Sequence, residues 1–470
     1  MRKLAAILLL YVASSAAQSP VSIEVHPEKP GPAIPSNFIG LSFETAAVLP
    51  NAGKGYLFHP GNTNLVRLFR TLGIRNLRIG GNTADRPTVK VPGNSDVDNL
   101  FGFSRAAGAR VIYTLRLRES TPEDAVRAAQ YLMSRYRPDI DCLSIGNEPN
   151  IYFKDYSAYR EQLKKYMDAI AALPQSSGIK FCGPSTTPGK PEWARGFADD
   201  FGPSGRVQWV TQHSYPGGSG RKIQDAALGR DLLLSTDFQQ SNEDLYGLFA
   251  PQVSSDGLTY RLEETNNFFN GGAKDVSDTF ASALWGLDYL YWWAAHNAQG
   301  INFHTGDNVA AGEQQTPCRY AVFWTSETGY SVHPLGYGMK AFELGSHGRL
   351  LPVQIVLNKG NVNLTAYAVL GEDQSLYITV INKEHGPAGR AATVTIDPGN
   401  GYAHGQEMLL TAPNNDVSAQ SGITLGGASI MDNGRWKGKW IPVARSHKGK
   451  ELSLAIPPAT AVVVNLRAVE

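Results

Sequence analysis

The chain has 470 residues, enough for one large domain and a smaller second one. Its 43 lysine and arginine residues balance 42 aspartate and glutamate residues, and the net charge of +1 argues against nucleic acid or an anionic membrane as the main partner. An anionic substrate is not excluded, because its recognition needs only a few local groups.

Residues 1–17 have the pattern of a secretory signal peptide. Arg2 and Lys3 supply the positive start, residues 5–12 the apolar run, and residues 14–17 the small side chains of a cleavage site. The run is too short for a transmembrane helix, which needs roughly 20 apolar residues. We therefore expect a secreted protein, with a buried N-terminal helix as the alternative for this segment.

Short apolar runs alternate with helical patterns from about residue 36 to 305. Eight runs, each flanked by turn residues, predict strands that are buried on both faces. These runs are Phe38–Phe43, Asn76–Ile79, Val111–Leu117, Ile140–Ile145, Ile179–Gly183, Val207–Gln212, Leu258–Leu262 and Gly300–His304.

Helical patterns fill the intervals between these runs. Thr121 precedes a proline and two acidic residues, as at a helix N-terminus, and residues 275–297 carry apolar side chains at helical spacing. Eight strands alternating with helices predict a (β/α)8 barrel, which we place at residues 33–347. A doubly wound sheet would alternate similarly, but no glycine-rich phosphate-binding turn follows the first strand.

From about Gly348 onward the sequence changes to short strands separated by turn clusters. The predicted strands are Leu364–Leu370, Ser375–Ile381, Ala392–Ile396, Glu407–Leu410 and Ala461–Leu466. This pattern predicts a β-sandwich over residues 348–470. We expect residues 18–32, with an early strand at Val21–Val25, to join that sandwich.

The chain has three cysteines, Cys142, Cys182 and Cys318. Cys142 and Cys182 lie in apolar strand-like runs, so we interpret both as small buried apolar residues. No cysteine and histidine cluster has metal-ligand spacing, so we expect neither a metal nor another cofactor. Asn363 begins an Asn-Leu-Thr sequon, an N-glycosylation acceptor in a eukaryotic secretory pathway.

Active sites of (β/α)8 barrels lie at the C-terminal ends of the strands. Polar residues at those ends are therefore the candidates for chemistry. They are Glu44, Arg78, Asn82, Asp85, Asn147, Glu148, His213, Tyr215, Glu263, Glu264, His304 and Asp307.

Carboxylates end both the fourth strand, with Glu148, and the seventh, with Glu263-Glu264. A retaining glycosidase needs a carboxylate nucleophile and a carboxylic acid proton donor about 5–5.5 Å apart. Arg78 and Tyr215 are the types of residue that keep a nucleophile ionised. One strand-end glutamate alone would more often be solvated surface, but the pair in this setting predicts catalysis.

The string Gly146-Asn147-Glu148-Pro149 after the fourth strand, with a carboxylate ending the seventh, resembles the clan A retaining glycoside hydrolases. Further segments resemble glycoside hydrolase family 79, the β-glucuronidase and heparanase group. These segments are Gly40–Glu44, Leu77–Asn82, Glu264-Thr265 followed by Asn270–Gly272, Val276–Ser282 and Leu335–Tyr337. They span the predicted barrel in order, and the β-rich tail fits the second domain of that family.

The resemblance implies a role for each matching residue. Glu148 would be the acid/base, Glu264 the nucleophile, and Asn147 would hydrogen-bond the sugar 2-hydroxyl. Glu263 is the rival nucleophile, because neighbouring strand residues point to opposite faces and only one of the two can line the site. The Glu-Thr match favours Glu264, and a non-catalytic Glu263 would form an ion pair behind the site or between helices.

In the family, the loop after the nucleophile binds the sugar carboxylate through backbone N–H groups and a tyrosine. This chain has Phe269 at the tyrosine position, so one hydroxyl donor to the sugar carboxylate is missing. Either the preference for a uronic acid is lost, or Gly271, Tyr337 and Lys274 take over the binding of the carboxylate. The other expected substrate contacts are Glu44, Asp85, Arg78, His213, His304 and Tyr215. For Glu44, Asp85 and the two histidines a structural role is the alternative.

We expect a secreted retaining β-glycoside hydrolase that acts from the chain end and releases glucuronic acid or 4-O-substituted glucuronic acid. Its partner would be a glucuronide-containing glycan or glycoside. One alternative keeps the reaction but changes the substrate, either to a neutral β-glycoside or to an internal, heparanase-like cut. The second alternative is a barrel that binds carbohydrate without catalysis.

Overall fold

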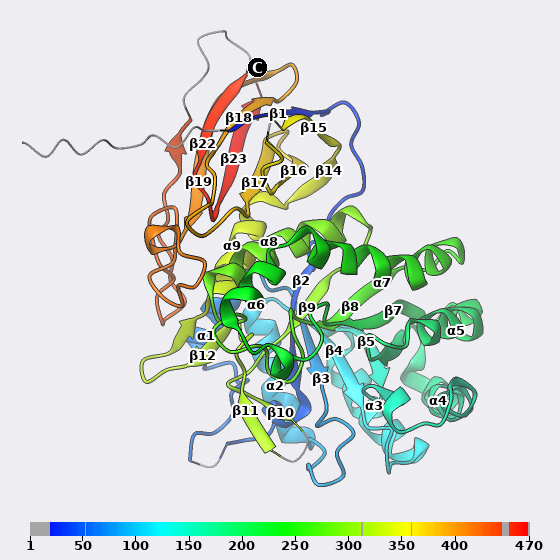
Figure 1. Ribbon diagram of the computed structural model, residues 1–470. Helices are drawn as coiled ribbons and strands as arrows, with labels where there is room; N and C mark the ends of the chain where they lie inside the picture. Colours follow the sequence, from blue (N-terminus) through cyan, green and yellow to red (C-terminus); the bar gives the residue numbers. More distant parts are fainter. Residues whose placement is uncertain (1–18, 52, 312–313, 359, 444–450, 469–470) are drawn as a thin grey trace, which may run out of the picture.

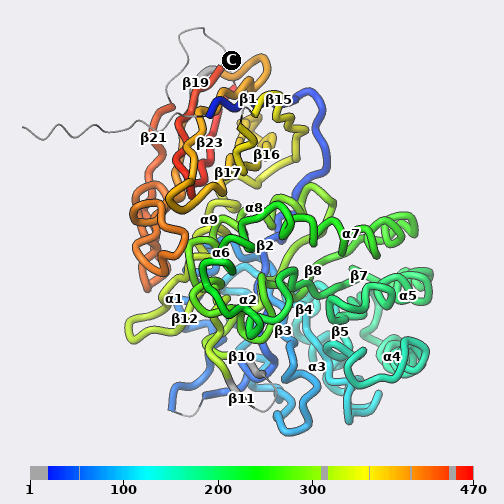
Figure 2. Tube along the Cα trace, viewed as in Figure 1, coloured from blue at the N-terminus to red at the C-terminus, as the bar shows by residue number. Residues whose placement is uncertain are grey.

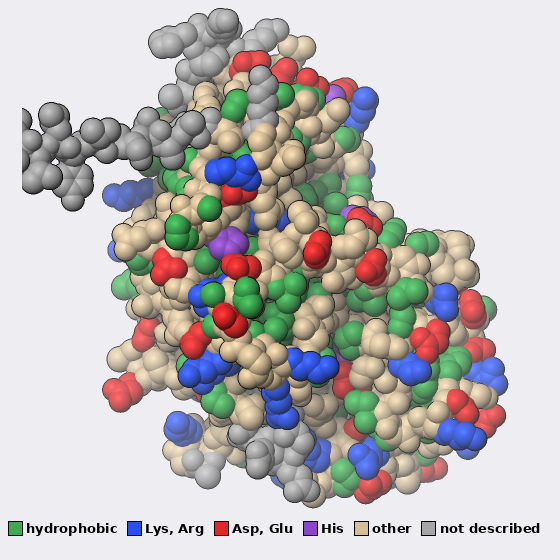
Figure 3. Space-filling view, in the orientation of Figure 1, with side chains coloured by type: hydrophobic (Ala, Val, Ile, Leu, Met, Phe, Trp, Pro, Cys, Tyr) green, Lys and Arg blue, Asp and Glu red, His purple; other side chains and the backbone are tan. Residues whose placement is uncertain are grey.

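The computed structural model describes residues 19–51, 53–311, 314–358, 360–443 and 451–468 (Figure 1). The expected signal peptide at residues 1–17 lies outside this part of the chain. Among the described residues, no helix is both long and apolar enough to span a membrane. Basic and acidic side chains are interspersed on the face shown in Figure 3, as the balanced net charge leads one to expect.

Eight parallel strands close into a barrel, which confirms the predicted (β/α)8 fold. They are β2 (Ile39–Glu44), β3 (Asn76–Gly80), β4 (Arg110–Leu115), β5 (Ile140–Ile145), β6 (Phe181–Thr186), β7 (Val207–Ser214), β8 (Tyr260–Thr265) and β9 (Ile301–His304). All eight predicted strands form, although their ends shift. The seventh continues to Thr265 instead of ending at Leu262, so Glu263 and Glu264 both lie inside the strand.

Helices surround the barrel and cover the apolar outer faces of its strands (Figure 1). They are α1 (Thr63–Thr71), α2 (Asn94–Ala107), α3 (Pro122–Tyr136), α4 (Tyr156–Ala171), α5 (Pro191–Phe201), α6 (Ala226–Leu233), α7 (Thr236–Ser255), α8 (Phe280–Ala295) and α9 (Pro334–Gly345). The Thr121 side chain caps α3 by accepting from the Asp124 N–H, as its sequence predicts. Two hairpins, β10 (Asn308–Ala311) with β11 (Gln314–Pro317) and β12 (Phe323–Thr325) with β13 (Tyr330–Val332), precede α9.

The C-terminal strands form two sheets that enclose a second apolar core, which confirms the predicted sandwich. One sheet has the order β15 (Val353–Asn358), β1 (Ser19–Val25), β18 (Ala392–Asp397), β22 (Leu452–Ile456). The other has the order β14 (Gly348–Leu351), β16 (Leu364–Gly371), β17 (Leu376–Asn382), β23 (Thr460–Ala468), β19 (Tyr402–Thr411), β20 (Thr424–Leu425), and β21 (Ile441–Pro442) also pairs with β19. In Figure 2 the blue strand β1 lies among these C-terminal strands.

A buried polar cluster joins the sandwich to the barrel. Asp288 on α8 pairs with Lys383 at 2.7 Å and accepts hydrogen bonds from the hydroxyls of Thr365 and Tyr367. A buried carboxylate with three such partners fixes the relative position of the elements that carry them. The two parts are therefore packed together rather than tethered.

Cys142 on β5 and Cys182 on β6 form a disulfide, with their Cα atoms 5.8 Å apart. The interpretation of both as small buried apolar residues was therefore right about their burial but missed the bond between them. Both side chains are buried in the barrel interior, as that interpretation required, but their pairing depends on the stagger of β5 against β6, which composition does not reveal. Cys318 is a buried free thiol.

The Asn363 side chain is held against the barrel. Its Nδ2, the atom that would carry an N-linked glycan, donates to the carbonyl oxygen of Leu234 at 2.9 Å. A glycan at this atom would require that contact to break, so the folded state disfavours the glycosylation that the sequon suggests.

Candidate active site

A pocket of about 310 Å³ opens at the C-terminal ends of the barrel strands. Its walls come from segments that follow β2, β3, β5, β6, β7, β8 and β9. The lining residues are Glu44, Asn82, Glu148, Ile151, Thr187, Pro188, Tyr215, Glu264, Phe269, Asn270, Gly271, His304 and Tyr320. The two predicted catalytic glutamates thus share one pocket, at the end of the barrel where the fold places active sites.

Glu148 sits on a tight turn between β5 and the 3₁₀ turn Pro149–Ile151. Its backbone is left-handed, with φ 47°, and its N–H donates to the carbonyl oxygen of Ser185 at 2.9 Å. Gly146, two residues earlier, has φ 82°, and a Cβ there would lie 2.9 Å from side-chain atoms of Leu117 and Tyr152. Left-handed backbone at a non-glycine residue costs free energy, so surrounding contacts must hold it in place.

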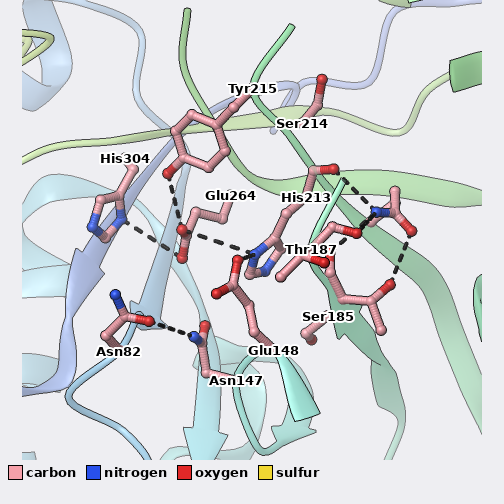
Figure 4. A network of polar contacts seen from close by, with 12 residues as sticks. Asn82, Asn147, Glu148, Ser185, Thr187, His213, Ser214, Tyr215, Glu264 and His304 are labelled. Carbon is pink, nitrogen blue, oxygen red and sulfur yellow. Dashed lines mark hydrogen bonds and ion pairs between the residues drawn. The ribbon is translucent and has the colours of Figure 1, made fainter. Parts of the chain in front are cut away.

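Glu264 is buried and fixed by two donors. Its Oε2 accepts from Arg78 Nη1 at 2.6 Å, and its Oε1 accepts from the Tyr215 hydroxyl at 2.9 Å. Arg78 also donates from Nη2 to Asn147 Oδ1 at 2.7 Å, which leaves the Asn147 Nδ2 directed toward Asn82 (Figure 4). Burial alone would raise the pKa of Glu264, but the charges of His304, His213 and Arg78 hold it well below its usual range.

A bulge in β8 explains how two consecutive glutamates can both face the barrel interior. On the β7 side, Arg261 pairs with Thr211 and Glu264 with His213, so β8 has one extra residue between these pairs. The register against β9 shifts over the same stretch, between Leu262 and Thr265. Glu264 therefore lines the pocket, while Glu263 points into the interior beneath it, fully buried. Only Glu264 of the two lines the pocket, as expected, but the premise that the two side chains point to opposite faces was wrong because of this bulge.

The carboxylates of Glu148 and Glu264 lie close together. One oxygen of each, together with a ring nitrogen of His213, lies within 4.8 Å of the others. Two carboxylates this close together can act on the same glycosidic bond. The same three side chains are the one group in the described chain close enough to hold a metal ion.

Two buried histidines flank the glutamates. His213 Nδ1 lies 3.1 Å from Glu148 Oε1, and His304 lies 3.8 Å from both Glu264 and Glu44. Burial alone would lower the pKa of His213, but Glu264 and Glu148 raise it to about 9, and Glu264 and Glu44 raise the pKa of His304 in the same way. The His213 ring thus carries a proton at neutral pH, which favours ion pairing with the glutamates over metal coordination.

The structure places half of the expected substrate contacts in the pocket. The residues that line it are Glu44, Tyr215, Phe269, Gly271 and His304, with Asn147 beside them. Glu44 Oε2 accepts from the N–H and hydroxyl of Thr83, and its other oxygen faces His304. At Gly81, with φ 66°, a Cβ would lie 2.6 Å from this carboxylate, so glycine is required there.

Four of the predicted substrate contacts do not line the pocket. Arg78 and His213 are fully buried beneath the glutamates, where their charge acts on Glu264 and Glu148 rather than on a ligand. Tyr337 lies on α9, where its hydroxyl accepts from the Ile430 N–H. Lys274 is exposed outside the pocket. A position near the end of a strand does not tell from sequence whether a side chain lies in the pocket or inside the barrel beneath it.

Asp85 is a fifth correction, because all of its hydrogen-bonding capacity is used within the protein. Its Oδ1 accepts from the N–H groups of Leu117 and Arg118, and its Oδ2 accepts from the Asn147 N–H at 2.7 Å and the Tyr152 hydroxyl at 2.7 Å. The carboxylate is buried and absent from the pocket wall. It holds the turn that carries Glu148 instead of binding a sugar hydroxyl.

Asp85→Ala is accordingly expected to destabilise the fold by about 2–4 kcal/mol, because two buried backbone N–H groups and a partly buried one lose their acceptor. It should also lower kcat by about 100-fold with little change in KM, since the turn that positions Glu148 loosens. Tyr152→Phe, which removes one of the four donors, is the matched control and should cost about 1 kcal/mol. Denaturant unfolding and steady-state kinetics measure both. If the variant kept its stability but bound substrate more weakly, Asp85 would instead be a substrate-binding residue.

Several pocket residues escaped prediction from sequence. Tyr320 is contributed by the segment between β11 and β12, Asn270 by the loop after β8, and Thr187 and Pro188 by the loop after β6. Ile151 follows Glu148 by three residues, and its side chain is 65% exposed at the pocket rim. Loop conformation decides which of these reach the pocket, so strand-end spacing gives no signal for them.

Comparisons with known proteins agree with the family resemblance. No family model matches the chain. A stretch of 189 residues is 25% identical to a β-glucuronidase of Aspergillus niger, and it covers 35% of this chain and 34% of that protein. The chain thus spans about a third of the length of this relative.

Solved structures share the fold over nearly the whole chain. A 4-O-α-L-rhamnosyl-β-D-glucuronidase from Fusarium oxysporum 12S superimposes with a TM-score of 0.72 at 18% identity, covering 95% of this chain and 100% of that one. A GH51 arabinofuranosidase from Xanthomonas axonopodis pv. citri gives a TM-score of 0.71 at 14% identity, covering 96% and 100%. At these identities the similarity shows a common barrel and sandwich architecture.

Proposed function

We propose that the protein is a retaining β-glucuronidase. The observation that carries this proposal is the pair Glu148 and Glu264 in one pocket, with carboxylate oxygens within 4.8 Å and Glu264 bonded to Arg78 and Tyr215. The partial similarity to a β-glucuronidase, and a fold shared with a rhamnosyl-glucuronidase, favour a glucuronide substrate.

The mechanism follows from the two different environments of the glutamates. Glu264, held ionised, attacks the anomeric carbon while Glu148 transfers a proton to the departing glycosidic oxygen, and an ester to Glu264 forms. Glu148, now ionised, takes a proton from water, whose oxygen attacks the same carbon and releases the sugar with net retention. Asn147 Nδ2 would donate to the sugar 2-hydroxyl, since its Oδ1 is already bound by Arg78.

The two ends of the pocket have different character. Next to Glu148, on the side where the leaving group must sit, lie Ile151, Thr187 and Pro188, none of which is charged. The rest of the wall includes Tyr320, Asn270 and Gly271, which offer hydroxyl, amide and backbone groups. We propose that the second group receives the sugar carboxylate and that Tyr320 replaces the hydroxyl missing at Phe269.

A neutral β-glycoside is the second candidate, and one observation favours it. Among the described lining residues there is no lysine or arginine, while Glu44, Glu148 and Glu264 are all carboxylates. A uronate would therefore depend on uncharged donors and on the His304 ring for its binding.

A panel of 4-nitrophenyl glycosides separates the candidates. We expect kcat/KM for the β-glucuronide to exceed that for the β-glucoside and β-xyloside by about 10³-fold or more, because unpaired buried donors penalise a sugar without the carboxylate. Tyr320→Phe should reduce this ratio while leaving the β-glucoside rate nearly unchanged. Equal rates on the neutral sugars would favour the second candidate, and binding without turnover of any glycoside would indicate a non-catalytic barrel.

We also propose export from the cell. The N-terminal sequence pattern supports this, and so does the disulfide between Cys142 and Cys182, because such bonds persist in oxidising compartments.

A further inference from the structure

A third carboxylate lies directly beneath the catalytic pair. Glu263 is fully buried, and its Oε1 accepts from the Thr211 hydroxyl at 3.1 Å and lies 3.8 Å from His213 Nε2. The opposite ring nitrogen, His213 Nδ1, lies 3.1 Å from Glu148 Oε1 and 3.9 Å from Glu264 Oε1. The imidazole is therefore bracketed by Glu263 below and the catalytic glutamates above.

Two buried atoms of this lower contact have no hydrogen bond of their own. Within the described chain, neither Glu263 Oε2 nor His213 Nε2 has a hydrogen-bond partner, although both atoms are buried. An unpaired buried charge is costly, whereas two opposite charges at this distance in a low-dielectric interior attract strongly. The ion pair therefore offsets part of the cost of burying each group, beside the Thr211 hydroxyl that donates to Glu263.

The charges around His213 come from three strands. Glu263 and Glu264 on β8 and Glu148 after β5 are negative, and Arg78 on β3 is positive but is bonded to Glu264. Burial opposes a charged imidazole, yet the pKa of His213 is raised to about 9 by Glu264, Glu148 and Glu263. The pKa of Glu263, which burial would raise, is lowered by His213 and Arg78.

We propose that Glu263 is a positioning residue that keeps His213 protonated through both steps of the reaction. This inference rests on the proposed double displacement. Before sugar transfer Glu264 is ionised and Glu148 is protonated, and after transfer Glu264 is an uncharged ester and Glu148 is ionised. The negative charge above the ring moves from one glutamate to the other, while Glu263 is chemically unchanged.

His213 therefore faces two carboxylates at each stage, and its Nδ1–H is available to whichever catalytic glutamate is ionised. Without Glu263 it would face one, and a buried imidazole with a single counter-charge would lose its proton more easily. A neutral His213 could then accept the proton of Glu148, and the general acid would be lost. Glu263 would thus act on the reaction through His213, without touching substrate.

The test is the titration of His213 in Glu263→Gln, followed by NMR of ¹³C-labelled histidine and assigned with His213→Asn. We expect the midpoint near pH 9 in the wild-type protein to fall by about one to two pH units in the variant. Glu263→Asp, which keeps the charge but shortens the side chain, should fall between them. Glu343 on the distant helix α9 lies 3.3 Å from His347, so Glu343→Gln removes a carboxylate beside another histidine. This variant is the matched control and should leave the titration midpoint of His213 unchanged.

Kinetics supply the second readout. At pH 6 His213 is protonated in both proteins, so kcat of Glu263→Gln should approach that of the wild-type protein. Above the lowered midpoint its kcat should fall further with each pH unit, with KM unaffected. A loss of activity that is constant across pH, with an unshifted His213 titration, would show a merely structural role and overturn the proposal.

The titration needs no substrate, so it separates this inference from the proposed function. If Glu263→Gln does not fold, the wild-type titration alone still decides, because a His213 midpoint at or below pH 6.5 contradicts a protonated ring. A midpoint near pH 9 in a protein that hydrolyses no glycoside would leave the charge arrangement intact and reject the β-glucuronidase.

Discussion

Glu264→Gln is expected to lower kcat on β-glucuronides by on the order of 10⁴- to 10⁶-fold. The reason is that an amide cannot form the ester with the anomeric carbon, and no other described carboxylate that lines the pocket is bonded to both a buried arginine and a tyrosine. Steady-state rates on 4-nitrophenyl β-glucuronide measure the loss. The amide also leaves Arg78 without its counter-charge, so we expect destabilisation of about 3–5 kcal/mol, which thermal unfolding will report.

Glu264→Ala tests the assignment of Glu264 as the nucleophile through the stereochemistry of a product. The smaller side chain leaves space beside the anomeric carbon on the face opposite the leaving group, and added azide should attack there. The product would be the α-glucuronyl azide, identified by the ¹H NMR coupling of its anomeric proton. Glu263→Ala is the matched neighbour, and it should yield no azide product because Glu264 is still present. An α-azide from Glu263→Ala instead would show that the adjacent glutamate is the nucleophile.

The choice between these two glutamates shows where prediction from sequence ends. The eight strands could be predicted because strands buried on both faces are short, apolar and bounded by turns, and this pattern is local. The bulge in β8 is not local. It appears only in the pairing of Glu264 with His213 on one side and Thr265 with Phe303 on the other. Alternation along a regular strand therefore gave the wrong orientation for Glu263.

The same limit explains which contacts were predicted correctly and which were not. Arg78 and Tyr215 were recognised as the types of residue that hold an ionised nucleophile, and both bond to Glu264. Asp85 was placed in the pocket from its strand-end position and Tyr337 from the family resemblance. Both side chains instead form hydrogen bonds with other parts of the protein, away from the pocket wall. Tyr320 lies between β11 and β12, and its approach to the pocket depends on the packing of that segment.

Glu148→Gln is expected to lower kcat/KM by about 10²- to 10⁴-fold for glucuronides of poor leaving groups and much less for 4-nitrophenyl glucuronide. The difference arises because an aryl oxide departs without a proton, whereas a sugar or alkyl alkoxide needs one from Glu148. The Glu148 carboxylate forms a side-chain hydrogen bond with His213 at the edge of the pocket, so the substitution should leave the unfolding temperature close to wild type. A uniform loss across leaving groups would contradict a role in proton transfer.

With Glu148→Ala the second step should become limiting, because no base remains to activate water against the ester of Glu264. The ester would then accumulate, giving a burst of 4-nitrophenol and a lowered KM. Azide needs no base and should restore turnover with the β-glucuronyl azide as product, the opposite anomer from that of Glu264→Ala. Opposite anomers from the two variants can arise only if Glu264 binds one face of the sugar and Glu148 serves the other. An identical anomer from both would reject double displacement in this pocket.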